Sequence, residues 1–232
     1  LAKWMPSNNT SSKQKRSEAV ILQSLLHLSA REYRKTLSRL REYLAVVDRK
    51  ASLNQWNDIN YNHVPSKANL KYRNAFLKHD EERRQAYLTS LEKGDDSVKI
   101  NANSMFLYDI VQTYVKADSG WDSSLNPYDE TLEQLWNAQE SPKDYDDILV
   151  IRDGSGSMGQ QLSGNSSVTA LSVADSIALY CAQHNKNESF KNRFITFSNR
   201  PQMVDISMCE TLRDKLRRLH RFDDYSNTDI EA

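Results

Sequence analysis

Residues 148–161 read ILVIRDGSGSMGQQ, and this stretch decides how the C-terminal part of the chain folds. The apolar run at 148–151 is typical of a strand that is buried on both faces of a sheet. It is followed by Asp153 and then by a loop rich in glycine and serine. In open α/β sheets, ligands bind at the loops that leave the C-terminal ends of the strands. The stretch therefore predicts a binding loop at the end of a strand.

The loop carries three oxygen-bearing side chains at alternate positions, Asp153, Ser155 and Ser157. One carboxylate and two hydroxyls suit a hard cation such as Mg²⁺, which takes about six oxygen ligands at roughly 2.0–2.1 Å and keeps several waters. Mn²⁺ and Ca²⁺ are alternatives. Because a single carboxylate leaves a divalent ion under-neutralised, the ion would accept an acidic group from a partner. The motif predicts metal-dependent binding.

An apolar strand, then Asp-x-Ser-x-Ser-Met-Gly and then a long helix resemble the metal-ion-dependent adhesion site (MIDAS) of von Willebrand factor A (vWA) domains. The resemblance covers about residues 145–232. It implies that a threonine from a later loop completes the site, and Thr228 in this sequence is the match. The supporting aspartate that the family places further on falls beyond residue 232. Gly154 departs from the family, which often has a larger residue there.

Two other readings of the loop stay open. The loop could be a glycine–serine turn that binds no ion. Alternatively, Ser157 could be a hydrolase nucleophile on a strand-to-helix turn, but Ser155 stands where the Gly-x-Ser-x-Gly pattern has its first glycine. A hydrolase also needs a base, and His184 and His220 each fall at a helix end. A P-loop is excluded, because no Lys-Ser or Lys-Thr follows the glycines.

Strand and helix patterns alternate after residue 142. We expect strands at 148–151, 193–197 and 202–206, and helices at 168–184 and 209–222. This order begins a doubly wound α/β domain, and it has too few strands to complete one, so we expect the domain to be truncated. Arg152 lies between the first strand and Asp153. We expect it to be structural and to pair with a carboxylate such as Asp146.

The chain before residue 142 has the 3.6-residue apolar spacing of helices. Ser29-Ala-Arg-Glu32 has the pattern of a capping box and predicts a helix start. Other helices are expected at about 13–28, 66–79, 81–93, 105–117 and 128–139. The predicted fold class is therefore α + α/β, with an all-helical region at 1–142 and a vWA-like α/β domain at 143–232.

Charge is unevenly distributed, although the formal net charge is +0. Residues 1–50 hold eleven Lys or Arg against four Asp or Glu, whereas residues 118–147 hold one Lys against nine Asp or Glu. Basic side chains of the helical region could contact RNA phosphates. The alternative is a solvated charged face. The candidates are Arg31, Arg34, Lys35, Arg41, Lys67, Lys71 and Arg73.

The strings KWMPSNNTSSK, REYRKTLSRLREYLAVVDRK and VPSKANLKYRNAFLKHD resemble a family labelled only as a domain of unknown function (number 2828). The match extends over most of residues 3–232. Members of that family join a helical region to a vWA-like domain. The arrangement is also similar to the Ro ribonucleoproteins (TROVE module), in which a ring of paired HEAT-like helices binds RNA. This second resemblance implies RNA binding only by architecture, and no contact residue is transferred.

The two cysteines, Cys181 and Cys209, form no disulfide framework, which suits a reducing cytosol. The sequence shows no signal peptide and no apolar run long enough to span a membrane. We therefore predict a cytoplasmic, non-enzymatic protein that binds an acidic protein ligand through Mg²⁺ and could also bind RNA. A protein–protein scaffold without nucleic acid is the main alternative, and a serine hydrolase using Ser157 is the lesser one.

Overall fold

The computed structural model describes residues 4–44, 46–115, 125–140, 147–163, 168–198 and 200–223. Its contacts divide the chain into two compact units. The first comprises Leu1–Asn60 with Lys78–Glu81, and the second comprises Tyr61–Leu77 with Glu82–Ala232. Among the described residues, no helix combines the length and the apolar character that a bilayer span requires.

The first unit is built from helices α1 (Lys13–Leu25), α2 (Ala30–Tyr43) and α3 (Val47–Ser52), followed by the short 3-10 helix η1 (Trp56–Asp58). The predicted capping box is confirmed, because the Ser29 side chain accepts from Glu32 N and the Glu32 carboxylate accepts from Ser29 N. Ala19, Tyr33 and Leu37 form the buried core between α1 and α2. The Tyr33 hydroxyl donates to Pro6 O at 2.9 Å, which ties the preceding segment to α2.

In the described part of the second unit, four α-helices and one 3-10 helix precede the sheet in the sequence. They are η2 (Tyr61–His63), α4 (Ser66–His79), α5 (Glu81–Glu92), α6 (Leu107–Tyr114) and α7 (Glu130–Asn137). Arg84 of α5 is fully buried and donates to Asn69 Oδ1 and Thr131 Oγ1, at 3.1 Å each. Its guanidinium also lies 5.0–5.3 Å from the ring centroids of three aromatic side chains, Tyr61, Phe76 and Tyr87. One arginine thereby links α4, α5 and α7.

Three short strands form a mixed sheet in the order β1-β2-β3. β1 (Ile151–Asp153) pairs in parallel with β2 (Arg193–Phe197), and β3 (Met203–Asp205) pairs antiparallel to β2. The α + α/β layout is confirmed, and the predicted strand at 193–197 is correct. Antiparallel pairing of β3 follows from the five residues 198–202 that connect it to β2, since a parallel crossover needs a dozen or more.

The expectation of a strand buried on both faces at 148–151 is wrong. Regular pairing begins only at Ile151, whose side chain is 62% exposed. The buried side chain of β1 is Arg152, which is 1% exposed. The physical reason is that successive side chains of a strand point to opposite faces of the sheet, so Arg152 lies on the face covered by α8, where Asp175 pairs with it, and Ile151 lies on the other face.

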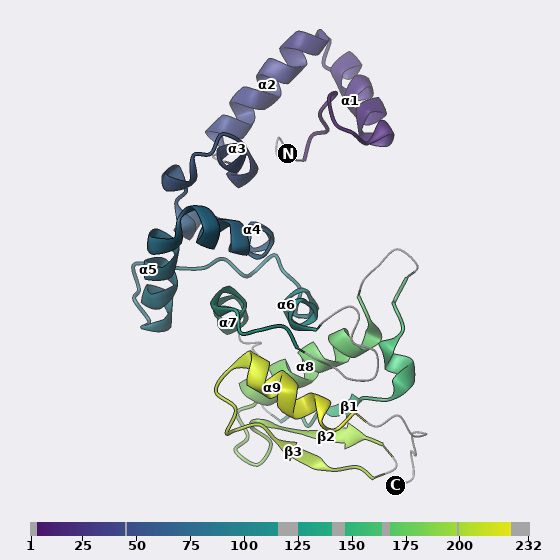
Figure 1. The fold of residues 1–232 in the computed structure, drawn as a ribbon. Coiled ribbons are helices and arrows are strands. Elements are labelled where there is room, and N and C mark those ends of the chain that lie inside the picture. Colours follow the sequence, from purple (N-terminus) through teal and green to yellow (C-terminus); the bar gives the residue numbers. More distant parts are fainter. Residues whose placement is uncertain are drawn as a thin grey trace. The chain divides into compact units, whose positions relative to one another are not determined.

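Two pairs of helices stack in layers against the sheet (Figure 1). Helix α8 (Ala170–His184) packs on β1 and β2, and α9 (Leu212–His220) lies beside it. Helices α6 and α7 cover α8 and α9 on the side away from the sheet (Figure 1). The core of these layers is apolar and consists of Ile110, Val111, Tyr114, Leu132, Leu135, Trp136, Ala178, Leu179, Ala182, Phe194, Val204, Ile206, Leu212, Leu216 and Leu219.

A buried carboxylate joins the layers. Glu133 of α7 accepts from the backbone N–H of Leu212 at 2.7 Å and of Arg213 at 3.2 Å, which are the first two amides of α9. It also accepts from the Tyr114 hydroxyl of α6 at 2.7 Å. Burial raises the pKa of Tyr114, and the neighbouring Glu133 raises it further. The compact unit thus extends across residue 142, where the sequence suggests a domain boundary.

Candidate functional site

Asp153 is the last residue of β1, and its loop brings three oxygen-bearing side chains together. Asp153 Oδ1 accepts from Ser155 N at 2.8 Å, which folds the loop back over the strand end. Ser155 Oγ and Ser157 Oγ are 3.1 Å apart. Ser155 is nearly buried and Ser157 is exposed on the 3-10 helix η3 (Gly156–Gly159). The carboxylate and the two hydroxyls therefore form one cluster that reaches the surface.

The spacing of the hydroxyl oxygens fits a small cation. In an octahedral Mg²⁺ site with ligands at roughly 2.0–2.1 Å, two neighbouring ligands are about 2.9 Å apart, because that separation is the bond length multiplied by √2. The observed separation of 3.1 Å is close to this value. Asp153 Oδ1 is engaged by Ser155 N, and among the described residues nothing hydrogen-bonds to Asp153 Oδ2. The donor set is therefore compatible with Mg²⁺.

The remaining ligand predicted from the sequence, Thr228, lies outside the described residues. Within the described part of the chain, no three His, Cys, Asp or Glu side chains gather in a way that could hold a metal ion. A cation at this loop would therefore depend on hydroxyl and water ligands around one carboxylate.

A buried ionic cluster lies directly behind the loop. Arg152 donates from Nε and Nη2 to Asp175 Oδ1 of α8, at 2.9 and 2.7 Å, and its Nη1 forms an ion pair with Asp223. His220 Nε2 of α9 lies 3.0 Å from Asp175 Oδ2. Arg152, Asp175 and Asp223 are all nearly excluded from solvent. Arg152 is structural, as predicted; Asp146, the partner suggested from the sequence, lies outside the described residues.

Burial and charge act against each other in this cluster. Burial by itself lowers the pKa of Arg152, and the carboxylates of Asp175 and Asp223 more than offset that effect, so the pKa is raised. For Asp223, burial raises the pKa more than the neighbouring Arg152 and His220 lower it. The cluster therefore keeps Arg152 charged. It disfavours the ionised form of Asp223.

The cluster explains why residue 154 is a glycine. A Cβ on Gly154 would lie 2.1 Å from Arg152 Nη1, 3.0 Å from Arg152 Cζ and 3.1 Å from Asp223 Oδ1. The glycine at this position is thus coupled to the buried arginine beside it.

We expect Gly154→Ala to lower the free energy of unfolding by about 1–3 kcal/mol, as overpacking does in a close-packed interior. The added methyl group must displace a guanidinium that two hydrogen bonds to Asp175 hold in place. Gly159→Ala is the matched control, because a Cβ there meets nothing within 4 Å. Urea unfolding of both variants measures the difference. Equal effects at the two glycines would contradict the close approach of Arg152.

Among the described residues, neither histidine proposed as the base of a hydrolase lies at Ser157. Ser157 Oγ contacts Ser155 Oγ, and neither histidine named from the sequence reaches it. His184 Nδ1 lies 2.9 Å from Tyr180 O, and His220 Nε2 is engaged by Asp175. Sequence reasoning did not find Asp175 and Asp223, and it named His220 only as a possible base for Ser157. Their signal is indirect: a lone arginine inside an apolar strand requires buried acidic partners.

The basic side chains suggested for RNA binding differ in how they are engaged. Arg41 donates to Ser7 Oγ at 2.9 Å and to Met5 O at 2.7 Å. Arg73 forms a salt bridge with Asp129 at 2.8 Å. These two guanidinium groups therefore have intramolecular roles. The other five candidates, Arg31, Arg34, Lys35, Lys67 and Lys71, have exposed side chains.

Comparison with known proteins places the chain in a family. A family model described as "Domain of unknown function (DUF2828)" matches residues 1–142. The chain belongs to the DUF2828 family. The resemblance suggested by the sequence is correct for this region, but it does not extend through residue 232. A second model, "Domain of unknown function (DUF7788)", matches residues 147–232 of this DUF2828 protein and therefore contains the Asp153 loop.

The DUF2828 chain is also similar to a viral protein. It is 28% identical over 222 residues to "Uncharacterized protein L728" of Acanthamoeba polyphaga mimivirus. The alignment covers 86% of this chain and 35% of that relative, so the chain spans about a third of the relative's length. No solved structure matches the chain significantly.

Proposed function

We propose that the region around β1 is a vWA-like module that binds a divalent cation, with Mg²⁺ the preferred ion, and uses it to hold an acidic group of a protein partner. The observation that carries this proposal is the cluster of Asp153, Ser155 and Ser157 at the C-terminal end of β1, with its hydroxyl oxygens 3.1 Å apart. Thr228 is the proposed fourth ligand, on the resemblance to the adhesion site.

Charge balance supports an acidic partner. Asp153 is the only carboxylate in the cluster of three loop side chains, so a bound divalent ion would keep a net positive charge. The exposed Ser157 leaves the outer side of the cluster open to solvent. Water completes the coordination of Mg²⁺ readily, and a carboxylate is the ligand that both replaces water and neutralises the ion. In this role the chain would bind without transforming its partner.

Magnesium should stabilise the protein in proportion to its binding. For one site, saturation to 100 times the dissociation constant adds about 2.7 kcal/mol, and EDTA removes that increment. We expect Asp153→Ala to abolish the rise in melting temperature caused by Mg²⁺. Differential scanning calorimetry measures the melting temperature, first without Mg²⁺ and then as its concentration is raised in 10-fold steps.

The chain offers a matched control for this experiment. Asp205 ends β3, and its Oδ1 accepts from Ser207 N at 2.8 Å, as Asp153 Oδ1 does from Ser155 N. The position that corresponds to Ser157 is Cys209, so this second Asp-x-Ser turn lacks the second hydroxyl. Asp205→Ala should keep the full response to Mg²⁺. If wild type and Asp153→Ala respond alike, or if neither responds, the proposal is wrong.

A further inference from the structure

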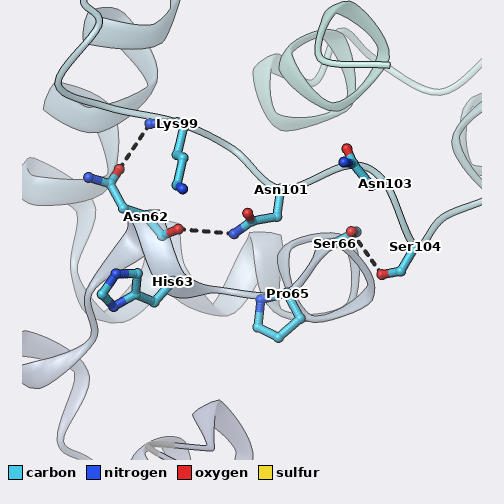
Figure 2. A pocket seen from close by; sticks show the side chains of 8 residues that line it. All are labelled: Asn62, His63, Pro65, Ser66, Lys99, Asn101, Asn103 and Ser104. Atoms are coloured by element: carbon cyan, nitrogen blue, oxygen red, sulfur yellow. Dashed lines mark hydrogen bonds between the residues drawn. The ribbon is translucent and has the colours of Figure 1, made fainter. Parts of the chain in front are cut away.

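A separate polar pocket lies between the start of α4 and the segment that precedes α6 (Figure 2). Its volume is about 510 Å³, and it is broadly open to solvent. It is lined by the end of η2, by Pro65 and Ser66, and by side chains between Lys99 and Ser104. None of its residues belongs to the loop at Asp153.

Hydrogen bonds hold the two walls of this pocket together. Asn62 Oδ1 accepts from Lys99 N at 3.0 Å, and Asn101 Nδ2 donates to Asn62 O at 3.0 Å and to Val64 O at 2.9 Å. At the other end, the hydroxyls of Ser66 and Ser104 are 3.1 Å apart. Figure 2 shows the contacts of Asn62 with Lys99 and Asn101 and the contact of Ser66 with Ser104, which join the wall segments. The pocket is therefore formed before any ligand arrives, which lowers the entropic cost of binding.

The pocket favours negative charge. Lys99 and His63 both line it, and among the residues that the structure describes neither has an ion-pair partner. Figure 2 shows the Lys99 side chain extending from its wall toward the side where Asn62 and His63 lie. No Asp or Glu is among the described residues that line the pocket. A phosphate group there would meet one ammonium and one imidazole, with the Glu140 carboxylate hydrogen-bonded to Asn103, one of the lining residues.

Two side-chain amide oxygens of the pocket are hydrogen-bond acceptors without a partner among the described residues. Asn101 uses its Nδ2 within the protein, and Asn103 Nδ2 donates to Glu140 Oε1 at 2.6 Å, so both side chains keep Oδ1 for a ligand. Amide oxygens accept from hydroxyl groups. The complement of one ammonium, one imidazole and two such acceptors is a molecule with one phosphate and a hydroxyl-bearing body.

We propose that this pocket binds a small phosphate ester of sugar size, with Lys99 and His63 holding the phosphate and the side chains of Asn101 and Asn103 holding hydroxyl groups of its body. The proposal is independent of the metal-binding function, because it uses none of the same residues. It adds a small-molecule site to the region matched by the DUF2828 model.

Isothermal titration of the whole chain with ribose 5-phosphate, inorganic phosphate and ribose tests the proposal. We expect saturable binding of ribose 5-phosphate, weaker binding of phosphate and none of ribose. Lys99→Met should weaken ribose 5-phosphate binding about tenfold, the loss of one charge-assisted hydrogen bond. The control is Lys93→Met, which removes an exposed lysine outside the pocket and should leave binding unchanged.

Three results would overturn the proposal. One is the absence of saturable binding of ribose 5-phosphate at millimolar concentration. Another is an equal loss in Lys99→Met and Lys93→Met, which would show general charge attraction. The third is binding of an oligoribonucleotide by a chain that does not bind ribose 5-phosphate, which would assign the basic groups to a polymer. Unfolding curves of both variants confirm that the comparison is made between folded proteins.

Discussion

Arg152→Met should lower the free energy of unfolding by about 3–5 kcal/mol at neutral pH, the loss typical of a broken buried ion pair. The substitution keeps an apolar stem of similar length, and it leaves Asp175 and Asp223 buried without their cation. Folded domains are stable by only about 5–15 kcal/mol, so this single change would remove a large part of the total. Urea unfolding followed by circular dichroism measures it.

An exposed ion pair supplies the control. Arg217 pairs with Asp214 at 3.2 Å on the surface of α9, and both side chains are at least 41% exposed. Arg217→Met should change stability by no more than about 1 kcal/mol, because exposed pairs are screened by water. A loss below about 1 kcal/mol in Arg152→Met would contradict the buried position of its guanidinium.

The acidic partners of Arg152 should not be equivalent. Asp175 accepts two hydrogen bonds from Arg152 and also contacts His220. The raised pKa of Asp223, in contrast, means that the folded protein disfavours its ionised form. Asp175→Asn should therefore cost more stability than Asp223→Asn. This ranking keeps the interpretation testable even if Arg152→Met does not fold.

Glu133→Ala should lower the free energy of unfolding by at least about 3 kcal/mol, since a hydrogen bond to a charged group contributes about 1.5–3 kcal/mol, three donors lose their acceptor, and such contributions do not add in full. The donors are the Tyr114 hydroxyl and the first two amides of α9, at Leu212 and Arg213. The loss also removes a negative charge from the positive end of the α9 dipole. Thermal and urea unfolding measure the effect.

The neighbouring Glu130 on α7 is the matched control. Burial raises its pKa, as does the nearby Glu92, so the folded protein disfavours its charge. Glu130→Gln should therefore leave stability unchanged or slightly increase it at neutral pH. If Glu133→Ala were as neutral as Glu130→Gln, the carboxylate would not be capping α9.

Local features of the fold could be predicted from the sequence. The capping box at Ser29 and Glu32 needs only four residues, and the structure forms it. The strand RFITF is alternately buried and half-buried, and its bounds at 193–197 agree with the prediction. Both depend on short-range backbone and side-chain preferences that a single stretch of sequence contains.

Features that join distant segments could not be predicted. Arg152 and Asp175 are 23 residues apart, and Glu133 reaches amides 79 and 80 residues further along the chain. Their pairing depends on how α7, α8 and α9 pack, which the spacing of apolar residues does not specify. The orientation of β3 is a different case, because the short connection after Phe197 already required antiparallel pairing. At the candidate site, Asp153, Ser155 and Ser157 could be found from their motif, whereas the ionic cluster behind them could not.

The edge position of β1 has a consequence for how the Asp153 loop is completed. On the side away from β2, β1 has no pairing strand among the described residues. The exposed Ile151 belongs to this edge strand. Such an edge presents free backbone donors and acceptors to an incoming strand. A strand that joins in parallel would end beside Asp153, so the residues that follow it would enter the same cluster of oxygens.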